Sequence, residues 1–226
     1  MLVYDRRGHS RSERPATQGS WDEDGDDLAA LLEALDLAPA HVATNSGGGN
    51  IALRLATRRA DVFRSLSCHE PGFASLLPDD PEIQEMLQQA MGILEVVGGR
   101  IVDGDHEGAA RQFVDEFILG PGGWENQLPP EVRAVFVTNA PTFLDELQDP
   151  NQTTIDEDAL ARLDLPVRFT EGTESPAVFG RVIDRLVELI PGAAREAIEG
   201  AGHLPQLQTP ERFVQVTTRA VQHASG

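Results

Sequence analysis

The segment Thr44-Asn45-Ser46-Gly47-Gly48 has the residue types of a nucleophilic serine turn. It lies between an apolar run that predicts a strand and a run of helical period. A serine at such a tight corner is exposed for attack on a carbonyl, and small neighbours let the helix approach the strand. Gly48 meets that need directly, whereas Thr44 meets it only in part. We therefore predict Ser46 as a nucleophile and the backbone N–H of Gly47 as an oxyanion donor at the helix N-terminus.

A glycine-rich turn that holds a phosphate is the alternative interpretation of this segment. Phosphate-binding loops carry a lysine after the glycines, or glycines with the spacing G-x-G-x-x-G, and neither pattern surrounds Ser46. Nucleotide binding would show as a rise in melting temperature on adding nucleotide. The residue pattern favours nucleophilic chemistry.

A histidine near the C-terminal end could supply the base that a serine nucleophile needs. His203 lies in the segment Gly200–Pro205, after a predicted strand and before a predicted helix. A loop in this position is presented at the carboxyl edge of a parallel sheet. His203 also follows Ser46 with room for an acid between them, which gives the order serine, acid, histidine.

The elements that must position these residues alternate between strand and helix. Strands are predicted over 2–4, 41–44, 63–69, 166–170 and 194–198, and helices over 28–35, 51–56, 178–190 and 210–220. Asp24 or Asp26 is expected to cap the first of these helices. This alternation predicts an α/β fold with a mostly parallel sheet and helices on both faces.

The middle of the chain has a different pattern. Helical periodicity dominates 82–97, 107–118 and 130–147, with proline and glycine turns between them. We therefore predict a helical insertion over 73–163, placed between two parts of one sheet domain, 1–72 and 164–226.

Three stretches together resemble the α/β-hydrolase superfamily: residues 4–12 (Tyr-Asp-Arg-Arg-Gly-His-Ser-Arg-Ser), the turn around Ser46, and Gly200–Pro205. They occur in the family's order, and the resemblance covers essentially the whole chain. It implies a serine hydrolase that cleaves a small ester, thioester or related carbonyl compound through an acyl-enzyme, with the insertion as the family's cap. A serine at the turn disfavours dehalogenation and epoxide opening, for which the superfamily uses an aspartate there.

The catalytic acid is left open between two glutamates. The family usually takes its acid from the stretch that here reads Glu171–Pro176, but Ser175 occupies the expected position. A serine cannot stabilise an imidazolium as a carboxylate does. We favour Glu70, because some members of the superfamily take the acid from the end of the strand after the turn helix. Glu174, one residue from the usual position, is the alternative.

The resemblance also implies that the family's first strands, and the loop with the second oxyanion N–H, are missing before Leu2. We expect a natural start further upstream or a degraded copy. Loss of one oxyanion donor costs about 2.7–4 kcal/mol of transition-state stabilisation. This gap and Ser175 favour an alternative function, a non-catalytic hydrolase-like binding or scaffold protein.

Composition restricts the partners of the chain. Its 226 residues carry a formal net charge of -19, which repels phosphate backbones and anionic lipids. We expect a small-molecule substrate and neither nucleic acid nor a membrane as partner, while the oligomeric state stays unknown. The six histidines show no ligand spacing, so no metal or other cofactor is expected. Cys68 is expected to be a buried small hydrophobe, and the absence of a signal-peptide pattern predicts a cytoplasmic protein.

Overall fold

The computed structural model describes residues 1–16 and 19–223. The chain forms two compact units, Met1–Asp24 with Asp80–Gln152 and Gly25–Asp79 with Thr153–Gly226. Among the described residues, no helix has the length and apolar character needed to cross a membrane. The cap over 73–163 stays a prediction.

The second unit contains a four-stranded sheet in the order β1-β2-β3-β4. Its strands are β1 (Ala40–Asn45), β2 (Phe63–His69), β3 (Val167–Gly172) and β4 (Ala194–Ile198). Every neighbouring pair is parallel, with Asn45 opposite His69 and His69 opposite Thr170. The carboxyl ends of β1, β2 and β3 therefore meet at one edge of the sheet. The predicted parallel α/β sheet is confirmed.

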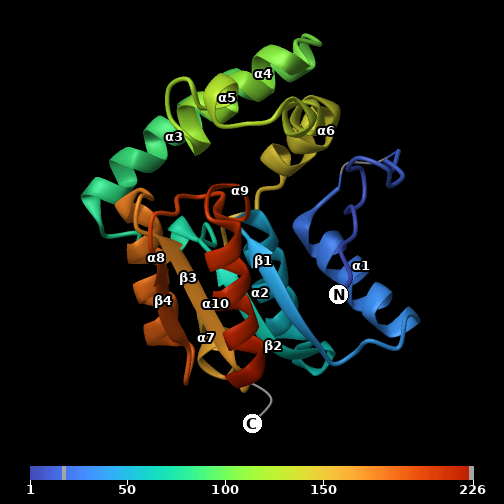
Figure 1. Cartoon of the computed structure of the whole chain (residues 1–226), viewed down its shortest axis with the longest axis vertical. Coiled ribbons are helices and arrows are strands. Elements are labelled where there is room, and N and C mark those ends of the chain that lie inside the picture. Colours follow the sequence, from blue (N-terminus) through green and yellow to red (C-terminus); the bar gives the residue numbers. More distant parts are fainter. Residues whose placement is uncertain (17–18, 224–226) are drawn as a thin grey trace. The chain divides into compact units, whose positions relative to one another are not determined.

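Helices cover both faces of this sheet. Figure 1 shows α10 (Pro210–His223) in front of the strands and α2 (Gly47–Arg58) behind them, and α8 (Ala177–Leu189) contacts β3 and β4. Strands covered on both faces are expected to be buried along their length, and β2 is buried at every position except Arg64, although it includes two serines and a histidine. The shorter helical segments of this unit are η1 (Ala60–Val62), η2 (Ala74–Leu76), α7 (Glu157–Ala161) and α9 (Pro205–Gln208).

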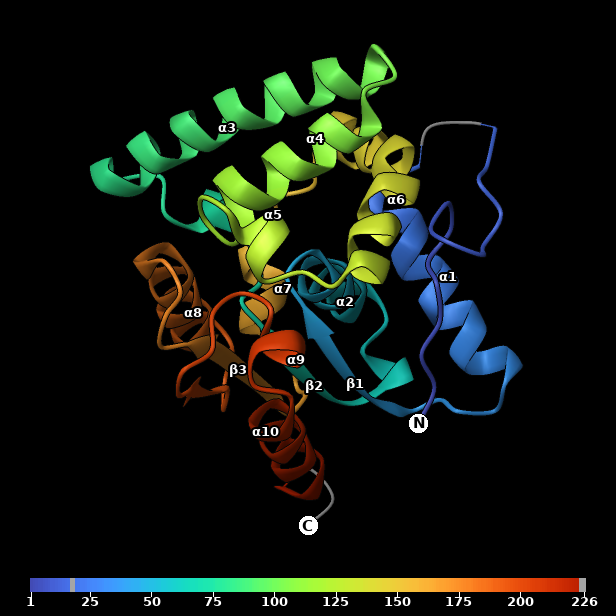
Figure 2. The ribbon, with the colours of Figure 1, turned by 45° about the horizontal axis from the view of Figure 1, so that its top comes forward.

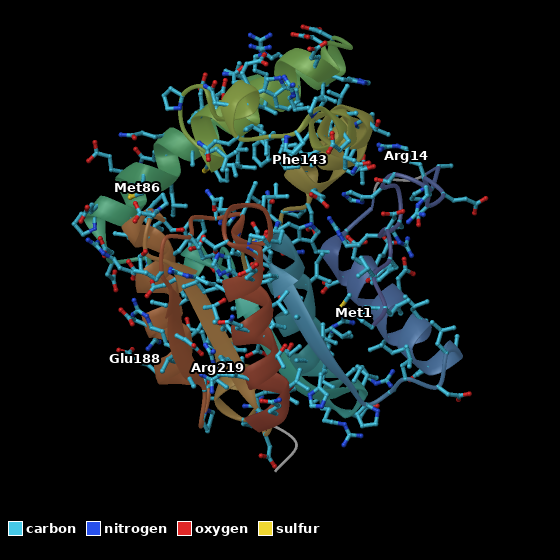
Figure 3. The ribbon with its side chains drawn as sticks, in the orientation of Figure 1. Met1, Arg14, Met86, Phe143, Glu188 and Arg219 are labelled. Atoms are coloured by element: carbon cyan, nitrogen blue, oxygen red, sulfur yellow. The ribbon has the colours of Figure 1, made fainter. Side chains whose placement is uncertain are left out.

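The first unit is built largely from helices. It contains α3 (Pro81–Val102), α4 (His106–Phe113), the π-turn η3 (Val114–Ile118), α5 (Gly123–Asn126) and α6 (Pro130–Gln148). Figure 2 shows α3 and α4 side by side, and both contact α6. Phe143, labelled in Figure 3, lies 4.5 Å from Phe113 between ring centroids and packs on the buried cluster of Val97, Ile101, Ala109 and Ala140.

Two sequence predictions are wrong in this part of the chain. Residues 2–4 are not a strand, because a strand needs a hydrogen-bonded neighbour and only β1 to β4 form the described sheet. The helix α1 (Trp21–Ala34) begins earlier than predicted, so neither Asp24 nor Asp26 caps it. Ser20 caps the helix instead. Its Oγ accepts a hydrogen bond from the backbone N–H of Glu23 at 3.3 Å and donates one to the Glu23 carboxylate at 3.4 Å.

A buried group of charges ties the N-terminal segment to α6 within the first unit. The Arg6 guanidinium donates to Asp24 Oδ2 and to Glu146 Oε1, both at 2.5 Å, and the Asp24 side chain is only 7% exposed. Burial raises the pKa of Asp24 to about 6 with Glu146 adding to the effect, although Arg6 opposes it. The charges of Arg6 and Glu146 act on this pKa in opposite directions, so burial is the main reason why the pKa of Asp24 is raised.

The raised pKa predicts that protonation of Asp24 stabilises the folded chain. Between about pH 7 and about pH 5 the folded state takes up a proton that the unfolded state does not, which should add about 1 kcal/mol to the free energy of unfolding. The contribution is lost again as the pH rises through the folded pKa. Urea unfolding of wild type and Asp24→Asn at both pH values measures it. If the difference in free energy of unfolding between the two proteins does not change with pH, this expectation is contradicted.

Candidate active site

Ser46 occupies a strained corner between β1 and α2. Its φ of 52° and ψ of -126° place a non-glycine residue in a region that L residues rarely adopt. Backbone hydrogen bonds hold the corner on both sides: the N–H of Ser46 donates to His69 O at 2.8 Å, and its carbonyl accepts from Gly49 N at 2.7 Å. The surrounding structure therefore maintains the strain and fixes the position of the serine.

The glycines after Ser46 have different roles. A Cβ added to Gly49 would lie 3.1 Å from Pro71 Cβ, whereas one on Gly48 would make only ordinary contact at 3.5 Å with Thr44 Cβ. Gly49 therefore makes the tightest contact, with Pro71 in the segment after β2, and sequence reasoning missed this position. Beneath it lies Cys68, which is fully buried as predicted, and burial raises the pKa of its thiol to about 12.

Gly47 is the first residue of α2, and the first turn of this helix contains no acidic residue. The first amides of a helix have no acceptor within it, and they carry the positive end of the helix dipole. This end of α2 therefore suits negative charge developing next to Ser46. Across the described residues, no group of three or more His, Cys, Asp or Glu side chains could hold a metal ion.

Glu70 follows β2 and has no exposed surface. Its Oε2 lies 2.6 Å from His203 Nδ1, and its Oε1 accepts from the Gly172 N–H at 2.8 Å. Burial alone would raise the pKa of Glu70. The hydrogen bond with His203, the nearby His69 and the Gly172 amide outweigh burial, and the pKa lies below its usual value. The carboxylate is therefore ionised at neutral pH.

The alternative acid is placed elsewhere. Glu174 is exposed, and its backbone N–H donates to Ala201 O at 2.9 Å. The Ser175 hydroxyl is buried without a hydrogen-bond partner among the described residues, yet it lies close enough to Glu70 to help lower the pKa of that carboxyl. Of the two glutamates predicted as candidates, the structure brings Glu70 to the histidine and leaves Glu174 in solvent.

The His203 ring is held between a carboxylate and an aromatic ring. It is stacked on Phe179, with centroids 4.6 Å apart and an angle of 18° between the planes. Because Nδ1 is hydrogen-bonded to Glu70, Nε2 is the nitrogen that can exchange a proton with a reacting group. Nothing in the spacing of the sequence indicates Phe179. Within the described part of the chain, the Ser46 hydroxyl itself has no hydrogen-bond partner.

His69 lies beside the Glu70–His203 pair, and its hydrogen bonds give it a structural role. Its Nε2 donates to Gly202 O at 3.2 Å, and its Nδ1 accepts from the Thr170 hydroxyl at 2.9 Å. Burial lowers the pKa of His69, although Glu70 opposes the shift. A neutral His69 with its proton on Nε2 satisfies both contacts and links β2, β3 and the loop of His203.

Gly172, at the end of β3, is a position that sequence reasoning missed. A Cβ there would lie 2.2 Å from Ala201 O and 2.9 Å from Gly202 Cα. We expect Gly172→Ala to lower the free energy of unfolding by about 3 kcal/mol, because the backbone of the His203 loop must move. Gly99→Ala in α3 is the matched control, since a Cβ there meets nothing within 4 Å. Equal urea midpoints for the two variants would contradict the expectation.

Comparison with known proteins gives a family match over most of the chain. The sequence pattern of the alpha/beta hydrolase family matches residues 1–216. A non-heme chloroperoxidase of Streptomyces lividans is 26% identical over 90% of this chain and 74% of its own. A pimeloyl-[acyl-carrier protein] methyl ester esterase of Neisseria meningitidis is 27% identical over 83% of this chain and 69% of its own.

A solved structure agrees with this match. The structure described as Est816, an N-acyl homoserine lactone degrading enzyme, is 26% identical, covers 95% of this chain and 80% of its own, and superposes with a TM-score of 0.69. The relatives named in these comparisons thus include an esterase and a lactone-degrading enzyme.

Proposed function

Because the chain belongs to the alpha/beta hydrolase family, we propose that it is a serine hydrolase that cleaves a small ester, thioester or related carbonyl compound through an acyl-enzyme. The observation that carries the proposal is the buried pair of Glu70 and His203, 2.6 Å apart, at the sheet edge where Ser46 occupies its strained corner. An ionised carboxylate on Nδ1 stabilises the charge that the imidazole gains when it accepts a proton on Nε2.

In this mechanism Ser46 Oγ attacks the carbonyl carbon while His203 Nε2 takes the hydroxyl proton. The oxygen of the substrate becomes negative, and the Gly47 N–H stabilises it at the start of α2. His203 then gives its proton to the leaving group, which leaves an acyl group on Ser46. Water attacks this ester in the second half of the reaction, with His203 again as the base, and restores the free serine. Glu70 orients the imidazole throughout.

The relatives support the ester-like class of substrate. One is named a methyl ester esterase, and another is described as degrading a lactone, which is an internal ester. The first name describes attack on a carbonyl carbon that carries an oxygen leaving group, and the compound degraded by the second enzyme contains such a carbonyl in its lactone ring. The same chemistry at Ser46 needs only the groups described above.

A second candidate function is a non-catalytic hydrolase-like binding protein. The observation in its favour is that the Ser46 hydroxyl has no hydrogen-bond partner within the described residues. Active serines are often found with longer contacts to their base before a substrate binds, so this observation by itself does not decide against catalysis.

A serine-directed fluorophosphonate separates these two functions. We expect one adduct per chain by intact mass, mapped to the peptide that contains Ser46. Protein shown to be folded by circular dichroism that gains no adduct would overturn the hydrolase and favour the binding protein.

A further inference from the structure

We propose that two carboxamide side chains, Asn45 and Gln208, are positioning residues that hold the backbone of His203 in place relative to Ser46. The inference rests on the proposed function, for which the place of the imidazole matters. It is drawn from hydrogen bonds on both sides of the histidine, all within the second unit.

Gln208 contacts the backbone on both sides of the histidine. As the last residue of α9, its Oε1 accepts from the N–H of Gly202 at 2.8 Å and from the N–H of Leu204 at 3.3 Å. Both groups are donors, so the oxygen of the carboxamide, and not its nitrogen, must face them. The carboxamide also packs closely on Gly202, because a Cβ there would lie 3.1 Å from Gln208 Nε2 and would displace the carboxamide by a few tenths of an ångström.

Asn45 binds the same loop from the opposite side. It ends β1, directly before Ser46, and its Nδ2 donates to the carbonyl of His203 at 3.0 Å. A carbonyl only accepts, so the nitrogen of Asn45 must face it. Its oxygen then receives a longer contact of 3.4 Å from Gln206 Nε2.

The two contacts meet at a single peptide unit. The carbonyl of His203 and the N–H of Leu204 belong to the peptide bond between these residues, so Asn45 holds one polar atom of that peptide and Gln208 the other. Its plane is therefore fixed, and with it the backbone from which the imidazole projects. Because Asn45 is adjacent to Ser46, the position of the base is set from the residue next to the nucleophile.

This arrangement complements the contacts of the ring. Glu70 and Phe179 fix the orientation of the imidazole, whereas the carboxamides fix the point of the backbone from which it projects. A displacement of about 1 Å at a reacting group can lower a rate by about 100-fold. Loss of either carboxamide contact should therefore reduce the reactivity of Ser46 while the chain stays folded.

The directions of the hydrogen bonds allow a test with isosteric variants. Gln208→Glu still presents an oxygen to both amides, so its fluorophosphonate labelling rate should stay within about threefold of wild type. Asn45→Asp places an oxygen against the carbonyl of His203, and we expect labelling to fall about 10- to 100-fold, as for Gln208→Ala. Gln222→Ala, at an exposed position of α10, is the control and should match wild type. A role in packing alone would leave both isosteric variants unchanged.

A second measurement reads the histidine independently of activity. The Nδ1 proton between His203 and Glu70 should give a far-downfield NMR signal in wild type and in Gln208→Glu, and this signal should shift or broaden in Asn45→Asp and Gln208→Ala. If wild type fails to label, the hydrolase proposal fails, and the NMR signal still decides the positioning role. Thermally stable Asn45→Asp and Gln208→Ala proteins with an unchanged signal would overturn the inference.

Discussion

Replacing Ser46 by alanine is expected to reduce hydrolysis of an activated ester such as p-nitrophenyl acetate to the background rate, a loss of about 10⁴-fold or more. The methyl group cannot form the acyl-enzyme, so the reaction loses its covalent route. Fluorophosphonate labelling should disappear in the same variant. Steady-state kinetics and intact mass measure the two effects.

The fold should survive this change, because the strained corner depends on backbone hydrogen bonds that alanine keeps. Ser75→Ala is a suitable control, since Ser75 is exposed in the same unit and lies apart from the His203 loop in the chain. If Ser46→Ala keeps the ester activity of wild type, Ser46 is not the nucleophile. In that case the activity would have to come from another group.

Glu70→Gln is expected to lower kcat by about 10⁴-fold, because a neutral amide no longer favours the tautomer with its proton on Nδ1 or stabilises the charged imidazole. The matched control is Glu174→Gln, which makes the same chemical change on an exposed side chain. It should keep the kcat of wild type within about threefold, as expected for a solvated charge. The two variants are compared by kcat and by the rate of fluorophosphonate labelling.

A larger loss of kcat in Glu174→Gln than in Glu70→Gln would reverse the assignment of the acid.

The two variants should also differ in stability. Because the pKa of Glu70 is lowered on folding, its ionised form stabilises the fold at neutral pH, and this contribution is lost as the pH falls through the folded pKa. The urea midpoint of Glu70→Gln should therefore approach that of wild type in acid.

Local patterns in the sequence were sufficient to predict the class of fold, and they indicated Ser46 and His203 as candidate site residues. The predicted strands 63–69 and 194–198 coincide with β2 and β4, although neither is a continuous apolar run, because β2 includes Arg64 and His69 and β4 includes Arg195 and Glu196. The turn at Ser46 and the loop of His203 were indicated by glycines and by neighbouring elements. The family resemblance, confirmed by the match over residues 1–216, added the order of these parts.

Only the tertiary structure decided which groups meet. Glu70 and His203 are 133 positions apart, and both glutamates are compatible with the sequence. Strand order places the end of β2 beside β3, where the Gly172 amide and the His203 loop converge on Glu70. The roles of Asn45 and Gln208 were invisible for the same reason, because a carboxamide binds whichever backbone groups the fold brings to it. A residue's type sets the chemistry it can do, and contacts between distant segments determine where it does so.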